Sequence, residues 1–195
     1  MASAVSGLNK SVNEVDQSGF TLPEGFEVNI VAENLAYARF ILVTKNHDLI
    51  VSIADVGQIM LLQDTDGNGT NETHSILIDG LNGSQELAFD GDWLYFSESG
   101  SVSRVLFDQN TASLAVDIET LITGLPYDLI HKAKIIGISH DRKLHIGVGS
   151  PCNACELEDA RYAAMLHADL DGSNPQIYAT AITCPTQSLA TNVQT

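Results

Sequence analysis

Positively charged residues are scarce in this sequence. Nine Lys and Arg residues stand against 25 Asp and Glu residues, which gives a formal net charge of −16. Binding to nucleic-acid phosphates or to an anionic membrane surface requires clustered cations. We therefore expect neither partner, and we interpret the acidic surface as a solubility feature that carries no information about the fold.

Long apolar segments and cysteines are also scarce. No segment approaches the roughly 18 apolar residues of a membrane span, and residues 1–20 lack the features of a secretory signal. We expect those residues to be a polar, disordered leader. Three cysteines cannot form a disulfide framework. Cys152 and Cys155 lack nearby partners for zinc, so we expect a local disulfide if the compartment is oxidising.

Helical periodicity is nearly absent, and short segments of period-two alternation dominate instead. Gly, Asn and Asp separate them, which indicates β-strands joined by turns. The first expected strand covers residues 26–32. After it, a pattern of four strands recurs three times with a period of about 45 to 50 residues. The copies place strands at residues 38–43, 48–53, 57–63 and 75–81; at 85–89, 93–98, 101–107 and 119–125; and at 133–139, 143–149, 163–170 and 176–182.

A four-strand repeat of this length is typical of a β-propeller blade, although a β-sandwich with coincidental spacing is an alternative. A propeller needs at least about four blades to close a ring. Three blades therefore form an open arc with exposed sheet edges. We therefore predict an all-β, incomplete propeller over residues 21–182, with an irregular tail at 183–195 that indicates truncation. The open edge predicts self-association.

One turn has the composition of a calcium site. In DTDGNGTNE, oxygen ligands alternate and glycines permit a tight turn. Asp64, Asp66 and Asn68 resemble the first half of a calcium loop, and Glu72 is a candidate for its missing carboxylate. A polar hairpin turn without metal is the alternative interpretation.

One histidine differs from the other five because it directly precedes the innermost strand of a blade. His131 lies seven residues before Ile138, just as Asn82 lies seven before Phe89 in the preceding copy. Such a position opens onto the central channel of a propeller. A neutral imidazole there could accept a proton from a substrate hydroxyl.

Residues 22–182 together resemble the soluble glucose and sorbosone dehydrogenases, six-bladed propellers that use pyrroloquinoline quinone (PQQ). LPEGFEVNIVAENL with Ala38 and Arg39 resembles the opening strand of that family, and DTDGNGTNETHSILIDGL resembles its blade-closing turn. His131, then Asp141 ten residues later and KLHIGVGSPCNAC, resembles its catalytic segment. AAMLHADLDGSNPQIYATAI resembles the strand pair that follows.

The resemblance implies a PQQ-dependent oxidoreductase that contains about three of six blades. His131 would be the general base acting on a sugar hydroxyl, while Asn82 and Lys134 would line the channel at the cofactor. It also implies calcium, an electron acceptor, and a periplasmic or extracellular location, although no signal peptide is visible.

The sequence departs from the family at one motif. An Arg-Asn-Pro segment that contacts the quinone is replaced here by Thr183, Cys184 and Pro185. Two other functions therefore stay open. One is a non-catalytic propeller fragment that serves as a binding module. The other is a metal-dependent, lactonase-like propeller, which would need channel-facing carboxylates such as Glu86.

Overall fold

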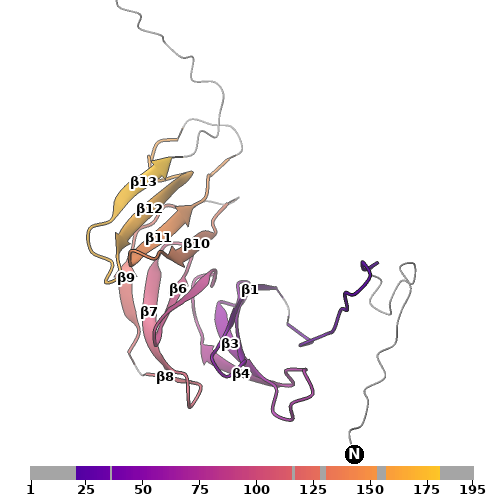
Figure 1. Ribbon diagram of the computed structural model, residues 1–195. Coiled ribbons are helices and arrows are strands. Elements are labelled where there is room, and N and C mark those ends of the chain that lie inside the picture. Colours follow the sequence, from indigo (N-terminus) through magenta and orange to yellow (C-terminus); the bar gives the residue numbers. More distant parts are fainter. Residues whose placement is uncertain (1–20, 36, 116, 128–130, 153–156, 181–195) are drawn as a thin grey trace, which may run out of the picture.

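The computed structural model describes residues 21–35, 37–115, 117–127, 131–152 and 157–180. These residues form thirteen strands and no helix, so the described part of the chain contains no helix able to cross a membrane. The strands make three antiparallel sheets that lie side by side in an arc (Figure 1). The predicted leader at 1–20 and the tail at 183–195 lie outside the described residues.

Each sheet is one blade, and its strands follow one another in chain order. Blade 1 consists of β1 (Ala38–Val43), β2 (Leu49–Ile53), β3 (Gln58–Gln63) and β4 (Thr73–Ile78). Blade 2 consists of β5 (Leu87–Asp90), β6 (Trp93–Ser97), β7 (Val102–Asp108), β8 (Ser113–Leu114) and β9 (Glu119–Ile122). Blade 3 consists of β10 (Lys134–Ile138), β11 (Lys143–Val148), β12 (Ala164–Asp169) and β13 (Gln176–Thr180).

This topology confirms the prediction of an all-β partial propeller built from four-stranded antiparallel blades. In blade 2, β9 pairs with β7 as the fourth strand, and the two-residue β8 only prolongs the hairpin that follows β7. The innermost strands of neighbouring blades are in contact, β1 with β5 and β5 with β10.

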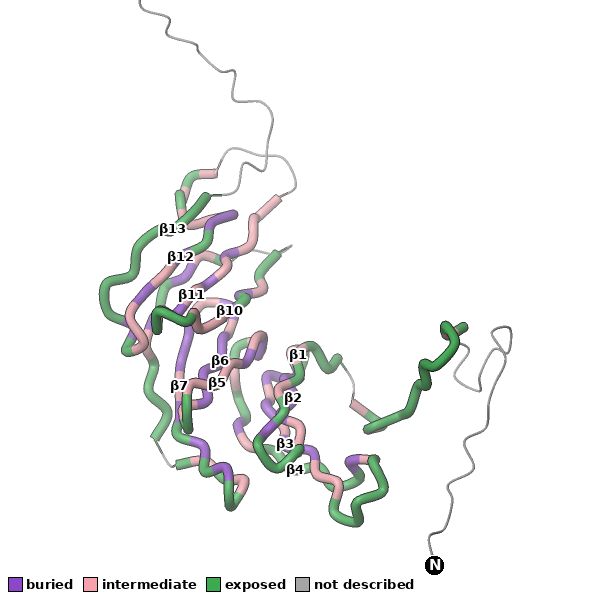
Figure 2. The backbone as a smooth tube through the Cα atoms, viewed as in Figure 1, coloured by how far each residue is buried: buried purple, intermediate pink, exposed green. Residues whose placement is uncertain are grey.

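The central strand β6 is buried on both faces because blade 2 packs between blades 1 and 3 (Figure 2). Leu94 and Phe96 of β6 belong to the apolar cluster shared with blade 1, whereas Tyr95 belongs to the cluster shared with blade 3. Successive side chains of a strand point to opposite faces. Alternation along β6 therefore supplies both interfaces, which explains its nearly continuous apolar sequence.

The Gly-Leu sequence that ends the first two copies has the same structural role in both. The Leu81 N–H donates to the Gly57 carbonyl at 2.9 Å, and the Leu125 N–H donates to the Gly100 carbonyl at 3.0 Å. Each bond ties the end of a blade to the start of its own third strand. The repeated sequence therefore reflects a repeated backbone contact.

A β-bulge recurs at the same place in all three blades. The register between third and fourth strands shifts by one residue, which leaves Leu77, Leu121 and Tyr178 unpaired. Leu77 packs on the cluster between blades 1 and 2, and Leu121 on the cluster between blades 2 and 3. By the same rule Tyr178 lies on the free face of blade 3, where its ring contacts those of His145 and His167.

The prediction of a strand at residues 26–32 is wrong. This segment is extended but has no strand assigned, and its alternating Phe26, Val28 and Ile30 are exposed. The reason is that backbone groups of a strand need a neighbouring ladder, and the segment has one backbone bond to blade 1, from the Asn71 N–H to the Val31 carbonyl at 2.6 Å. The residues that follow do pack, because Ala32 and Leu35 cover Val51 on the outer face of blade 1.

Gly57→Ala should be much more destabilising than Gly91→Ala. Both glycines have positive φ, +67° and +62°, so both substitutions carry the left-handed strain of about 1–2 kcal/mol. Only at Gly57 would the new Cβ meet another atom, the Leu81 carbonyl oxygen at 1.9 Å. We expect urea unfolding to show at least about 2 kcal/mol of additional loss for Gly57→Ala. Equal losses would refute the tight contact.

Candidate active site at the channel end of the blades

The residues that precede the innermost strands occupy equivalent positions in the three blades. The Ser99 N–H donates to the Asn82 carbonyl at 3.0 Å, and the Ala54 N–H donates to the Tyr37 carbonyl at 3.4 Å. In blade 3 the His131 carbonyl lies against Gly149. Each carbonyl therefore covers the end of the second strand, and His131 and Asn82 lie at equivalent backbone positions before β10 and β5.

Gly149 permits the position of His131. A Cβ at residue 149 would lie 1.9 Å from the His131 carbonyl oxygen and 3.0 Å from the His131 Cβ. Any larger residue would displace the histidine backbone. The glycine of the KLHIGVG segment is therefore part of the site.

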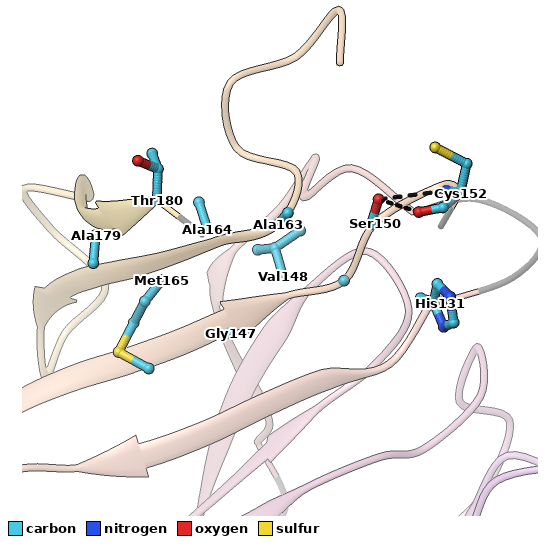
Figure 3. A pocket seen from close by; sticks show the side chains of 11 residues that line it. His131, Gly147, Val148, Ser150, Cys152, Ala163, Ala164, Met165, Ala179 and Thr180 are labelled. Carbon is cyan, nitrogen blue, oxygen red and sulfur yellow. Dashed lines mark hydrogen bonds between the residues drawn. The ribbon is translucent and has the colours of Figure 1, made fainter. Parts of the chain in front are cut away.

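The exposed side chain of His131 lies between two hollows. The larger, of about 630 Å³, is lined by His131, Ser150, Cys152 and residues in or next to β11 and β12, among them Gly147, Gly149, Ala163, Ala164 and Met165 (Figure 3). The smaller, of about 380 Å³, is lined by His131 and Lys132 from blade 3 and by Arg39 from blade 1. A base at this position can therefore contact molecules in both hollows.

Lys134 is fully buried at the start of β10. Its Nζ donates to the Lys132 carbonyl at 3.0 Å, and burial lowers the pKa of the amine to about 8. Ser97 Oγ donates to the Lys134 carbonyl at 2.8 Å and accepts the Glu86 N–H at 3.1 Å, which joins blades 2 and 3 at the channel. Direct contact between Lys134 and a cofactor stays a prediction.

The buried Lys134 amine should make stability depend on pH. Its folded pKa of about 8 lies below the ordinary 10.5, so the unfolded chain binds the proton more tightly. The cost to folding is therefore full below pH 8 and declines as pH rises toward 10.5. Lys134→Met should raise the free energy of unfolding at pH 7 by about 1 kcal/mol. It should also abolish the increase in the free energy of unfolding that the unmodified chain shows between about pH 8 and 10.5. Urea unfolding at pH 7 and 10 tests it, with exposed Lys45→Met as control.

Two carboxylates of blade 2 lie near the channel, and the sequence pointed to only one. Burial raises the pKa of Glu86, which lies just before β5. Glu98 accepts the Asn82 N–H at 2.6 Å and the Ser101 hydroxyl at 3.0 Å, so it fixes the backbone that carries Asn82. Glu98 ends a strand in the repeat, and its side-chain role could not be inferred from spacing.

Asp141 does not approach His131, although its spacing contributed to the resemblance. The two residues flank β10, whose five residues span about 17 Å when extended. Asp141 belongs to the turn between β10 and β11, where the Ser139 hydroxyl lowers its pKa. It therefore supports the hairpin and not the base.

The two cysteines of the CNAC sequence are only partly described. Cys152 is in a disulfide bond, which agrees with the predicted loop disulfide. Its predicted partner, Cys155, lies outside the described residues. The Ser150 hydroxyl donates to the Cys152 carbonyl at 2.7 Å and holds this loop beside the larger hollow (Figure 3).

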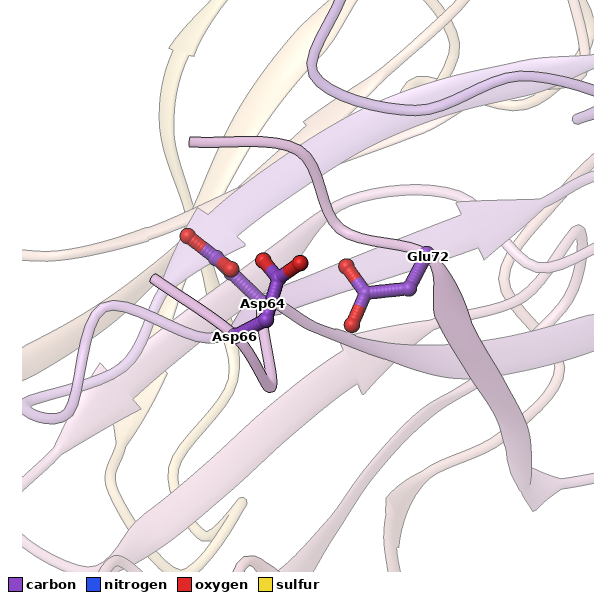
Figure 4. A group of neighbouring side chains, drawn as sticks. All are labelled: Asp64, Asp66 and Glu72. Atoms are coloured by element: carbon purple, nitrogen blue, oxygen red, sulfur yellow. The ribbon is translucent and has the colours of Figure 1, made fainter. Parts of the chain in front are cut away.

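The predicted calcium ligands gather in the loop between β3 and β4 (Figure 4). Carboxylate oxygens of Asp64, Asp66 and Glu72 lie within 4.8 Å of one another. The Gly69 N–H, with those of Gly67 and Asn68, holds the pKa of Asp64 below its ordinary value. The Asn68 amide donates to Asp66 at 3.0 Å. The loop lies on the outer strands of blade 1, so its carboxylates are remote from His131 in the fold.

Sequence reasoning missed Arg39 and Lys132 as channel residues. Arg39 was noted only as part of the opening strand, and Lys132 was not singled out. Their meeting at one hollow depends on the curvature of the arc, which brings blade 1 toward blade 3. The scarcity of cations was the one signal that could have directed attention to them.

Comparison with solved structures shows the same architecture. An iodide structure of a Trichoderma reesei protein of carbohydrate-active enzyme family AA12 matches 72% of this chain and 38% of its own, at 22% identity and a TM-score of 0.60. The holo PQQ domain of Coprinopsis cinerea pyranose dehydrogenase matches 76% of this chain and 39% of its own, at 18% identity and a TM-score of 0.65. The PQQ-bound aldose sugar dehydrogenase of Streptomyces coelicolor matches 74% of this chain and 48% of its own, at 22% identity and a TM-score of 0.59.

The chain thus spans less than half the length of these three structures. No curated protein matches it. A family model described as TrAA12-like matches residues 20–164, which is most of the described part of the chain. The chain therefore belongs to the TrAA12-like family.

Proposed function

We propose that this chain is a PQQ-dependent sugar oxidoreductase domain with His131 as its general base. The observation that carries the proposal is the position of His131, at the channel end of β10 and between two hollows. A base must lie within hydrogen-bond reach of the hydroxyl it deprotonates. From this position His131 can reach a substrate in one hollow while the cofactor occupies the other.

The larger hollow fits a planar cofactor. Gly147, Gly149, Ala163 and Ala164 give it a stretch of wall with small side chains, against which a flat ring system can lie, and Met165 lines the same hollow (Figure 3). Asn82 and Lys134, the candidate cofactor residues, lie at the starts of blades 2 and 3 but line neither hollow, so their contact with the cofactor is a separate prediction. PQQ, when bound, supplies the acceptor for the two electrons and the hydrogen that leave the carbon of the sugar.

His131 would accept the proton of the sugar hydroxyl at an imidazole nitrogen. Its backbone is fixed by the contact with Gly149, so the ring is presented from a rigid strand end. A fixed base contributes because the reacting atoms need not be brought together during the reaction. The product would be the corresponding lactone or carbonyl compound.

The remaining proposals concern metal, location and association. Calcium at Asp64, Asp66, Asn68 and Glu72 would be structural because the loop lies on outer strands. The disulfide at Cys152 supports an oxidising compartment, such as the periplasm or the extracellular space. An electron acceptor would reoxidise the cofactor.

Self-association is proposed because apolar residues remain open on both ends of the arc. Ile41 and Ile76 of blade 1 are 60% and 53% exposed, and Ile135 of blade 3 is 58% exposed. A second copy is the occupant with matching chemistry, since blades pack by such faces inside the arc. Sedimentation velocity should show dimers or larger species, and a monodisperse monomer would contradict this.

The activity is tested by adding PQQ and calcium to the purified chain and following dye reduction with aldoses. Sugar-dependent reduction supports the proposal. Saturable sugar binding without reduction would indicate a binding module. Hydrolysis of lactones with added divalent metal, without dye reduction, would indicate the lactonase-like function. Within the described residues, the three-ligand acidic cluster is remote from the channel, which disfavours that last outcome.

A further inference from the structure

The distribution of ion pairs singles out the channel. All Lys and Arg residues except Lys10 lie in the described part of the chain. Five of them pair with carboxylates: Lys45 with Asp92, Arg104 with Glu119, Arg142 with Asp90, Lys143 with Asp169, and Arg161 with Asp159. Among the described residues, only Arg39, Lys132 and Lys134 have no carboxylate within ion-pair distance. All three lie at the channel beside His131.

The absence of partners for these cations is informative because acids are abundant. The chain has 25 Asp and Glu residues, and five of its eight described Lys and Arg residues pair with one of them. Arg39 and Lys132 are exposed and line the smaller hollow with His131. Lys134 is buried next to this hollow, where its ammonium donates a hydrogen bond to the Lys132 carbonyl. A net charge of −16 repels anions elsewhere, so this cluster is where an anionic ligand would be favoured.

We propose that the substrate held in this hollow carries a carboxylate, as a hexuronic acid does, and is not a neutral hexose. The planar guanidinium of Arg39 can bind a carboxylate through two parallel hydrogen bonds, and Lys132 adds a point charge. A neutral hexose would leave these charges without a counterion. The redox step rests on the proposed function, whereas carboxylate binding does not.

The division of the site favours the substrate over the cofactor as the partner of these cations. His131 touches both hollows, and both Arg39 and Lys132 line the smaller one. The larger hollow, with its wall of small residues, contains neither cation. A carboxylate in the smaller hollow would therefore place the ring hydroxyls of the same sugar next to His131.

Calorimetric titration of the full chain with D-glucuronate and with D-glucose tests the proposal, because the two differ only at C6. Glucuronate should bind at least about tenfold more tightly at low salt, as expected for a charge-assisted hydrogen bond. Arg39→Gln and Lys132→Gln should each reduce glucuronate affinity about tenfold, and the loss should be clearly larger for glucuronate than for glucose. Lys45→Gln, which removes a cation outside the channel, should change neither.

Three results would overturn the proposal. They are equal binding of the two sugars, an equal effect of Lys45→Gln, and channel variants that lose PQQ binding while glucuronate binding is kept. The last would assign the cations to the cofactor. PQQ binding is followed separately by quinone absorbance. A chain that binds glucuronate through Arg39 and Lys132 but takes up no PQQ would keep this inference and remove the proposed function.

Discussion

His131→Ala should reduce sugar-dependent dye reduction by the PQQ-loaded chain by about 10²- to 10⁴-fold, the usual contribution of a general base. The reason is positional. His131 lies three residues before β10, and its carbonyl is fixed against Gly149. The residue lines both hollows. Removal of the imidazole leaves the substrate hydroxyl with water as its proton acceptor.

The matched control is His140→Ala. His140 is an exposed histidine in the turn at the other end of β10, so the same substitution in the same blade tests for nonspecific loss. Urea unfolding should be unchanged in both variants, and PQQ absorbance is used to compare their rates at equal cofactor loading. A His131→Ala chain that retains more than about a tenth of the rate would remove the general-base role.

Tyr95→Ala should reduce the free energy of unfolding by about 3–5 kcal/mol, as expected for loss of a fully buried aromatic ring. Tyr95 is 0% exposed in the cluster between blades 2 and 3. Its hydroxyl donates to the Leu170 carbonyl at 3.0 Å and accepts from Arg104 Nη1 at 3.2 Å. Its loss therefore affects packing and hydrogen bonding of two blades together.

Tyr95→Phe separates the two contributions. It keeps the ring and leaves the partly buried Leu170 carbonyl with one fewer donor, so urea unfolding should show a loss of about 1–2 kcal/mol. Arg104 still donates to that carbonyl at 3.1 Å, so the carbonyl keeps one donor and the loss in free energy of unfolding stays small. If Tyr95→Ala cost no more than Tyr95→Phe, the two blades would not share a packed interface in solution.

The strands were predictable because each repeats a local pattern. LHIGV alternates between apolar and other residues, and LIVSI is almost continuously apolar. Both patterns can be recognised from the local sequence without knowledge of the neighbouring strands. The segment at residues 26–32 has the same pattern and forms no strand. Pattern alone cannot show whether a neighbouring ladder exists, and among the described residues the one backbone bond from this segment to blade 1 comes from Asn71. The bulges at Leu77, Leu121 and Tyr178 were invisible for a related reason, since they arise from register between strands.

The site was predictable only as far as the repeat reached. Alignment of the copies placed His131 and Asn82 at equivalent strand starts, and the structure agrees. It could not show that Arg39 of blade 1 and Lys132 of blade 3 line one hollow, because that depends on the curvature of the arc. Nor could it show that Lys134 is buried with its amine on a backbone carbonyl. The spacing of Asp141 contributed only to the family resemblance, and the structure places it in the turn at the opposite end of β10 from His131.

The central claim is that this three-blade arc carries a quinone site, and PQQ binding tests it most directly. Purified chain should be titrated with PQQ and followed by quinone absorbance, with equilibrium dialysis to measure stoichiometry. The account predicts saturable binding of a single PQQ per chain, which Gly149→Ala should weaken by displacing His131, whereas Gly137→Ala, where a Cβ meets nothing within 4 Å, should not. Non-saturable binding, or identical behaviour of the two variants, would contradict it.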